Sequence, residues 1–427
     1  MKRTITAISV CWCLSPSVAW AVDWSANSTL SETVEFNDNL YLRSMLAGGP
    51  FANSVLGSYS TISANATART PTSTFNFDGS ISYRKYVGPG TEGQSSTESL
   101  SGNLHGHYET RGEVGGDRNY LDVGWSRQNT ALALLSDLGV TTPVSGSIDR
   151  TTIGGGIDRA LSRLDTVSFS ARSSLNTYEP ASAGTEFTDT SGNATWRHKV
   201  SSIASINVSS DIELLNYQTL PSSRLLIARE TAGLDLSLSP VLSLRGNAGI
   251  VYLKADGGVS TVPLLGTGTA PTVGGNSASA SGFIFNAALT YKMFKTTTLT
   301  LSAVRSVSPS VIGSINELTS VHAGINHAVN SRSSLSFGSD ISQQTSSGTT
   351  SELFSASVAY SYMLTKEWSA QFSYRYLHRF ASSGSSASGL TVDPLTGIPI
   401  FTGTGPANSN SILLVVSRSV SLLPDGY

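Results

Sequence analysis

Cysteine is almost absent from this chain of 427 residues, and its two cysteines, Cys11 and Cys13, lie near the start. They fall in a segment with a basic beginning, a short apolar stretch and the small-x-small sequence Ala19–Ala21, which indicates a secretory signal peptide of residues 1–21. The residues that precede the two cysteines are too large for a lipoprotein signal. The mature chain, residues 22–427, would therefore have no disulfide, no thiol nucleophile and no thiolate metal site, and its stability needs another source.

Charged residues are also scarce, at 13% of the chain against a usual share of about 25%. The 27 lysines and arginines are fewer than the 29 aspartates and glutamates, so the balance does not indicate a nucleic-acid-binding surface. After residue 21 the sequence has no apolar run of about 18 residues, which excludes a transmembrane helix, and no apolar stripe at helical spacing. Ser, Thr, Gly and Asn fill the composition instead, as in disordered segments or in β-proteins with a polar interior.

What the chain does contain is a period of two. The stretch Phe354–Phe380 places Phe, Tyr, Trp, Val or Ala at every second position on both sides of the short connection Leu364–Glu367, with mostly serine between them. Such alternation is typical of a β-strand, and two alternating runs around a tight polar connection predict a β-hairpin. The pattern recurs along the chain and predicts about 18 strands, at residues 23–36, 55–68, 74–87, 97–111, 119–133, 146–161, 164–178, 187–199, 202–216, 223–238, 241–255, 281–294, 296–308, 314–328, 332–344, 352–364, 367–380 and 410–423.

The connections between these strands alternate in length. Short connections such as Leu364–Glu367 are followed by longer ones, of which the largest are residues 256–280 and 381–409. A transmembrane barrel has this arrangement, with tight periplasmic turns and long extracellular loops. A soluble sandwich would also bury apolar strand faces, but it gives no reason for the alternation. The sequence therefore predicts an all-β fold, a transmembrane antiparallel β-barrel of about 18 strands, with residues 22–427 as one domain.

A barrel assigns a face to each kind of residue. The aromatic side chains of the strands would face lipid, namely Phe75, Phe77, Trp125, Phe169, Phe283, Phe285, Tyr291, Phe354, Tyr360, Tyr362, Trp368, Phe372, Tyr374 and Tyr376. Charged and imidazole side chains at alternate positions would line the lumen, namely Arg84, His105, His107, Asp122, Arg172, Asp211, Glu213, Asp235, Arg245, Lys292, Asp340 and Arg375. Opposite charges across a pore create a transverse field that selects polar solutes, and the plainer alternative is that these groups solvate or brace a wet interior.

The first predicted strand ends in Phe36 and is followed by Asn37, Asp38 and Asn39. In this pattern, and in its export signal followed by many alternating strands, the chain resembles the beta-barrel porin 2 group of Gram-negative outer-membrane proteins. Some members of that group are associated with exosortase and exopolysaccharide systems. The resemblance implies an outer-membrane barrel whose transported substance is undefined, and it implies no catalytic residue.

Barrels of this kind usually end in a strand with a terminal aromatic residue, which the assembly machinery recognises. Tyr427 is terminal and aromatic, but Pro424 interrupts the strand that precedes it. Either Tyr427 or the segment Val420–Leu423 would then carry the assembly signal.

Three motifs could carry chemistry. Gly88–Gly93 matches G-x-G-x-x-G, but the helix that a dinucleotide site needs does not follow, so a loop tip is the expected structure. His105 and His107 share one strand face with Glu109 and could bind a metal if a neighbouring strand supplied another ligand, whereas lining of the lumen is the plainer interpretation. A hydrolase would need a serine and a carboxylate beside one of the histidines His105, His107, His322 or His327.

Together these features predict a porin-like passive diffusion channel in the Gram-negative outer membrane, with both termini periplasmic and the long loops extracellular. It would not be an enzyme and would need no cofactor. Its partners would be outer-membrane lipid and lipopolysaccharide and the barrel-assembly machinery, but not nucleic acid. In one alternative the barrel serves an envelope system that exports polysaccharide or protein, and in another the chain is a secreted, soluble, adhesin-like β-protein.

Overall fold

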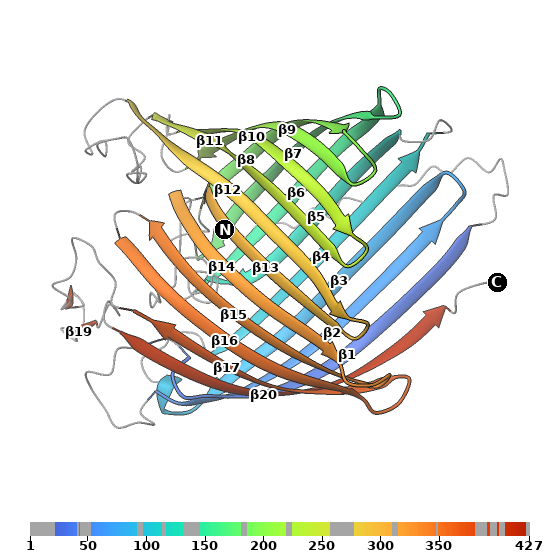
Figure 1. Cartoon of the computed structure of the whole chain (residues 1–427). Helices are drawn as coiled ribbons and strands as arrows, with labels where there is room; N and C mark the ends of the chain where they lie inside the picture. Colours follow the sequence, from blue (N-terminus) through green and yellow to red (C-terminus); the bar gives the residue numbers. More distant parts are fainter. Residues whose placement is uncertain are drawn as a thin grey trace, which may run out of the picture.

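A computed structural model of the chain shows one closed β-barrel (Figure 1). The structure describes residues 22–40, 42, 53–91, 97–112, 117–130, 146–180, 186–218, 224–256, 277–309, 315–346, 349–380, 391–392, 399–400 and 406–423. The expected signal peptide, residues 1–21, and one candidate for the assembly signal, Tyr427, lie outside these ranges, whereas the other candidate, Val420–Leu423, is the end of the last strand. Within them, no helix is both long enough and apolar enough to cross a membrane.

Eighteen strands make up the barrel. They are β1 (Asp23–Asn37), β2 (Val55–Arg69), β3 (Ser73–Val87), β4 (Glu98–Arg111), β5 (Arg118–Asn129), β6 (Ser147–Ala160), β7 (Asp165–Glu179), β8 (Phe187–Lys199), β9 (Ala204–Tyr217), β10 (Arg224–Ser239), β11 (Leu242–Asp256), β12 (Ser277–Phe294), β13 (Thr297–Pro309), β14 (Ile315–Ala328), β15 (Ser333–Ser346), β16 (Thr349–Met363), β17 (Trp368–Arg379) and β20 (Ala407–Leu423). A single 3-10 turn, Pro89–Thr91, follows β3, and a two-stranded pair of β18 (Thr391–Val392) and β19 (Pro399–Ile400) stands apart from the barrel sheet.

Each strand pairs antiparallel with its neighbours in the chain, and β1 pairs with both β2 and β20. This last pairing closes the sheet, so no strand of the barrel is left without a neighbour on either side. The predicted all-β barrel of about 18 strands is therefore confirmed. The largest differences from the predicted boundaries are four residues: β5 ends at Asn129, and β12 begins at Ser277, inside what the sequence predicted as a long loop.

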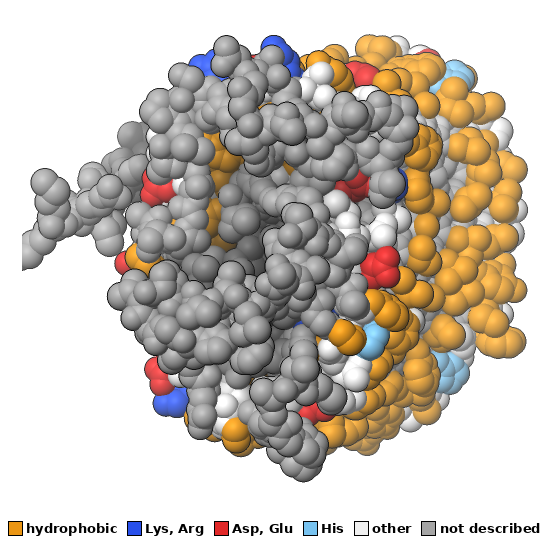
Figure 2. All heavy atoms as spheres, turned by 90° about the vertical axis from the view of Figure 1, so that its left-hand side faces the viewer, with side chains coloured by type: hydrophobic (Ala, Val, Ile, Leu, Met, Phe, Trp, Pro, Cys, Tyr) orange, Lys and Arg blue, Asp and Glu red, His pale blue; other side chains and the backbone are white. Residues whose placement is uncertain are grey.

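The two faces of the barrel wall differ in polarity, as the period of two requires. Large apolar side chains at alternate positions are exposed on the outer face, for example Ile81, Ile250 and Phe372 at 58%, 62% and 52%. Figure 2 shows hydrophobic side chains gathered on the part of the outer surface that is visible at its right-hand side. The fourteen aromatic residues predicted to face lipid occupy this same alternating set of positions. A soluble protein does not expose apolar surface so continuously, so the structure argues against the soluble alternative.

The face assignment can be tested with two adjacent residues of β17. Phe372 occupies the outer set of positions and Gln371 the inner set. Arginine at a lipid-facing position costs about 2 kcal/mol or more near the bilayer midplane, whereas arginine in a polar lumen costs little. We expect Phe372→Arg to lower the unfolding free energy in lipid vesicles by about that amount, and Gln371→Arg to leave it nearly unchanged. Equal losses in urea titrations of both variants would contradict the assignment.

The motif Asn37–Asp38–Asn39 fastens the first strand to the last. The Asp38 carboxylate accepts hydrogen bonds from the backbone N–H and the side-chain amide of Asn410, both at 2.6 Å. Asn39 donates its side-chain amide to the Asn408 carbonyl at 2.9 Å, and Ser409 donates its hydroxyl to the Asn37 side chain at 3.0 Å. The motif that carried the family resemblance is therefore a clasp at the seam where the barrel closes.

Candidate functional site: the inner wall of the barrel

The inner face of the wall carries the polar and charged positions. In the structure all twelve predicted lumen residues occupy alternate positions on the face opposite to the exposed apolar residues. Each lies opposite an inner-face residue of a neighbouring strand. Seven of them line one of two cavities on the inner wall: Arg84, His105, Asp122, Arg172, Asp211, Asp340 and Arg375.

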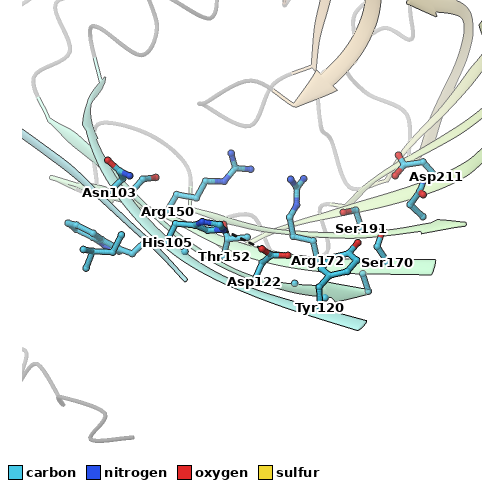
Figure 3. A pocket seen from close by; sticks show the side chains of 18 residues that line it. Asn103, His105, Tyr120, Asp122, Arg150, Thr152, Ser170, Arg172, Ser191 and Asp211 are labelled. Atoms are coloured by element: carbon cyan, nitrogen blue, oxygen red, sulfur yellow. Dashed lines mark ion pairs between the residues drawn. The ribbon is translucent and has the colours of Figure 1, made fainter. Parts of the chain in front are cut away.

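The first cavity, of about 610 Å³, lies against strands β4 to β9 (Figure 3). Its polar lining combines two arginines, two aspartates and a histidine with hydroxyl and amide groups, from Asn103, His105, Tyr120, Asp122, Ser126, Arg150, Thr152, Ser170, Arg172, Ser191, Asn193 and Asp211. Figure 3 shows the Arg150 and Arg172 side chains rising from the wall into the open space, with Asp211 at one side. A sequence of alternating strands cannot show this grouping, because it depends on which strands are neighbours.

The two histidines of β4 contact a single carboxylate on β5. Asp122 Oδ1 lies 2.7 Å from His107 Nδ1 and 3.3 Å from His105 Nε2, and Glu109 lies 3.6 Å from His107 Nε2. Within the described residues no group of three or more His, Cys, Asp or Glu side chains is arranged to hold a metal ion. The geometry agrees with the plainer interpretation of the His105–His107 pair, a hydrogen-bonded lining of the inner wall.

The second cavity, of about 750 Å³, lies against β1–β3, β14–β17 and β20. Its charged groups are fixed by neighbours: the Arg84 guanidinium stacks on the Tyr59 ring at 4.3 Å, and Arg375 lies 3.5 Å from the buried Glu35 carboxylate. The Asp340 carboxylate faces His322 at 3.8 Å. Each side of the barrel interior therefore presents both signs of charge, with most groups in contact with a partner.

A third part of the inner wall is apolar, which the sequence pattern did not predict. At the loop-side ends of β8 to β12, inner positions carry large apolar side chains that are almost completely buried. They are Phe187, Leu215, Tyr217, Leu225, Ile227, Val251, Leu253, Ala255 and Ile284. Two residues from other strands, Val307 of β13 and Ile315 of β14, complete this apolar cluster.

The contact with Val307 and Ile315 requires the loop-side end of β13 to separate from β12 and turn inward, together with the start of β14, which stays paired with β15 as far as Asn316. Pairing between β12 and β13 stops at Phe285 and Arg305, although β12 continues eight residues back to Ser277 and still pairs with β11. Ile315, Asn316 and Glu317 are all buried. In a barrel wall one of every two such residues would face lipid, so this end of the hairpin lies inside the barrel. Figure 1 shows the loop-side ends of β12 and β14 well apart. We call residues 305–309 and 315–319 the inturned end.

Two arginines hold the inturned end. Arg229, on the inner face of β10, donates to the Val307 carbonyl at 2.9 Å and forms ion pairs with Asp211 and with Glu213, the latter at 2.6 Å. Arg305 donates to the Phe283 carbonyl at 3.1 Å and pairs with Glu317. These bonds replace part of the strand pairing that β13 loses when it separates from β12. Arg229 was not among the predicted lumen residues, and the available signal was its position opposite Asp211 on the neighbouring strand β9.

Several sequence expectations are settled by local geometry. None of the four histidines considered for a hydrolase hydrogen-bonds a serine among the described residues, and His327 bonds the Thr297 hydroxyl at 2.8 Å. Gly88 has φ of +130°, and the Gly90 N–H bonds the Ser54 carbonyl at 3.0 Å, so the glycine motif makes a tight turn against β2. The long connections 256–280 and 381–409, which the sequence predicts as extracellular loops, lie mostly outside the described residues.

The family whose sequence model matches this chain is described as Putative beta-barrel porin 2, and the match covers residues 273–392. It is the family that the sequence resembles, and the matched region includes the inturned end. No curated protein sequence matches the chain.

Among solved structures, Acinetobacter baumannii OccAB4 is 11% identical with a TM-score of 0.46, over 94% of this chain and 98% of the other. Pseudomonas aeruginosa OccK2 (OpdF) is 10% identical with a TM-score of 0.47, over 94% and 98%. The FrpB iron transporter of Neisseria meningitidis is 8% identical with a TM-score of 0.46, over 93% and 81%. The closed sheet, its apolar outer face and the family match identify an outer-membrane β-barrel of porin-like fold.

Proposed function

We propose that this protein is an outer-membrane channel through which small polar solutes diffuse passively. The observation that carries the proposal is the polar inner wall with two cavities on different arcs of a closed barrel. A lumen lined by hydroxyls, amides and paired charges replaces part of the hydration shell of a polar solute while it passes. Both signs of charge are present in each cavity, so the inner wall as a whole does not favour a strong general preference for cations or for anions.

The orientation in the membrane forms part of the proposal. Eight connections of two to six residues lie at one end of the barrel, together with the start of β1 and the end of β20. The longest connections lie at the other end, where the β15–β16 connection is short as well. Outer-membrane barrels place short turns in the periplasm and long loops outside the cell. The chain ends would then be periplasmic, after removal of the signal peptide, and the inturned end would narrow the channel from the extracellular side.

The inturned end favours a second candidate function. A hairpin fixed inside the lumen by Arg229 and by the apolar cluster would restrict flow through the isolated barrel. A barrel that conducts only when an envelope export system displaces this hairpin would have such a structure. The two candidates differ in whether the purified protein conducts without a partner.

The test is solute flux through the purified, refolded protein in liposomes, with uncharged sugars of increasing size. A passive channel gives swelling rates that fall with sugar size and reach a cut-off. Membrane insertion is checked independently by the change in gel mobility that barrels show on boiling in detergent. Absence of flux from a correctly inserted protein would reject the passive channel and would support the barrel that needs an export partner.

A further inference from the structure

In the first cavity the acidic and basic groups lie at different depths. Asp189 of β8 is buried, with its side chain 1% exposed, whereas Arg150 and Arg172 are 44% and 52% exposed. Both guanidinium groups approach the same atom, Asp189 Oδ2, at 3.4 and 3.7 Å. The buried Asp189 carboxylate therefore holds the two guanidinium groups near each other. Both face the open space, as Figure 3 shows for Arg150 and Arg172.

The two guanidinium groups have donors to spare. A guanidinium carries five N–H donors. Within the described residues Arg150 uses one amino group on Ser174 and Asp189, each at 3.4 Å, and Arg172 makes no hydrogen bond, only its 3.7 Å ion pair. Both guanidinium groups approach Asp189 Oδ2, one at 3.4 Å and the other at 3.7 Å. The Nη2 atoms of Arg150 and Arg172 therefore cannot be farther apart than the sum of these two distances. A carboxylate of a solute can accept from both at once, in charge-assisted hydrogen bonds.

The acidic groups of the same cavity do not compete for these donors. Asp122 is engaged by His105 and His107, and Asp211 pairs with Arg229. The positive groups of the cavity are therefore the ones that remain available to a solute. This charge arrangement favours an anion over a cation at this arc of the wall.

The rest of the cavity lining suits a solute with many hydroxyl groups. Thr152, Ser170 and Ser191 supply hydroxyls, and Asn103 and Asn193 supply amides, which both donate and accept. Tyr120 adds an aromatic side chain to the lining. Its hydroxyl lies so near Gly156 that a Cβ atom added to this glycine would be 2.5 Å from the hydroxyl oxygen. A side chain larger than glycine at residue 156 would displace Tyr120, so the glycine shapes the cavity floor.

We propose that the Arg150–Arg172 pair is a binding subsite for polyhydroxylated carboxylates of the sugar-acid class. This inference rests on the proposed function for its biological use, since a channel with such a subsite would pass sugar acids in preference to neutral sugars of equal size. The carboxylate binds the two guanidinium groups, and the hydroxyls bind the Ser, Thr and Asn side chains of β4 and β6 to β8.

The experiment compares glucuronate with glucose as probes, by calorimetric binding to the protein in detergent and by efflux from liposomes. The variant is Arg150→Gln with Arg172→Gln, and the matched control is Arg375→Gln, which removes an equally exposed inner-wall arginine from the second cavity. We expect the double variant to weaken glucuronate binding about tenfold or more, with little change for the control. The ratio of glucuronate to glucose efflux should fall in parallel.

The outcomes separate the two proposals. If wild type binds glucuronate no better than glucose, or if Arg375→Gln weakens binding as much as the double variant, the subsite does not exist. If glucuronate binds and the double variant abolishes binding, the subsite stands even when neither sugar passes the membrane, and that absence of flux would count against the passive channel alone. Unchanged boiling-dependent gel mobility of the variants shows that the barrel has folded.

Discussion

Replacing Arg229 by methionine is expected to raise flux through the channel and to let larger sugars pass. Arg229 is the group on β10 that binds the Val307 carbonyl of the inturned end, and it neutralises Asp211 and Glu213. Removing one partner of a buried ion pair costs about 3–5 kcal/mol, because the remaining charges stay buried without compensation. Glu213, whose side chain is only 7% exposed, recovers full hydration when the inturned end moves away and water enters.

The matched control for Arg229 is Arg245→Met. Arg245 also lies on the inner face and pairs with an aspartate, Asp235 at 2.7 Å, but it does not contact the inturned end. The measurement is the rate of liposome swelling with a series of sugars from mono- to tetrasaccharide. If Arg229→Met and Arg245→Met give the same cut-off as the wild type, then the inturned end does not limit passage.

Replacing Asp38 by alanine is expected to weaken closure of the barrel by about 3–5 kcal/mol, since two charge-assisted hydrogen bonds are lost at once. The Asp38 carboxylate receives both the backbone and the side-chain N–H groups of Asn410, which belongs to the last strand. The first and last strands are distant in sequence, so closing this seam carries a large entropy cost that the clasp helps to offset. The temperature at which the folded band disappears on a detergent gel should fall accordingly.

Asp78→Ala is the control for the clasp. Asp78 lies on the inner face of β3, and within the described residues no hydrogen bond or ion pair involves its carboxylate. Asp78→Ala therefore removes one negative charge, as Asp38→Ala does, but it breaks no contact between strands. A loss of stability in Asp78→Ala as large as that in Asp38→Ala would show that charge, and not the seam contacts, sets the stability.

These two sites connect the fold to the proposed transport. The clasp at Asn37–Asp38–Asn39 joins the first strand to the last and so helps to keep the wall closed. In the proposed channel, the inturned end, which packs on the apolar cluster of β8 to β12, would limit the size of a solute. The Arg150–Arg172 pair would present positive charge to it. The proposal thus assigns closure, size limitation and choice of solute to separate residues.

The sequence by itself determined the strands and their faces. Alternation of Phe, Tyr and Trp with Ser and Asn in segments such as Trp368–Arg379 has a local cause, because successive side chains of a strand point to opposite sides. The same rule fixed the positions of His105, Asp122 and Arg375 on the inner face, and the short turns fixed neighbouring strands as antiparallel pairs.

Only the tertiary structure decided which inner-face groups meet. Asp189 joins Arg150 and Arg172 from three different strands, and Asp38 meets Asn410 across nearly the whole length of the chain. The inturned end also escaped the sequence pattern, because Leu299, Leu301 and Val307 alternate in the same way whether β13 stays in the wall or leaves it. The period of two shows which residues lie on each face of a single strand. Closure of the barrel, the register between strands and the separation of β13 from β12 depend on contacts between residues far apart in the sequence.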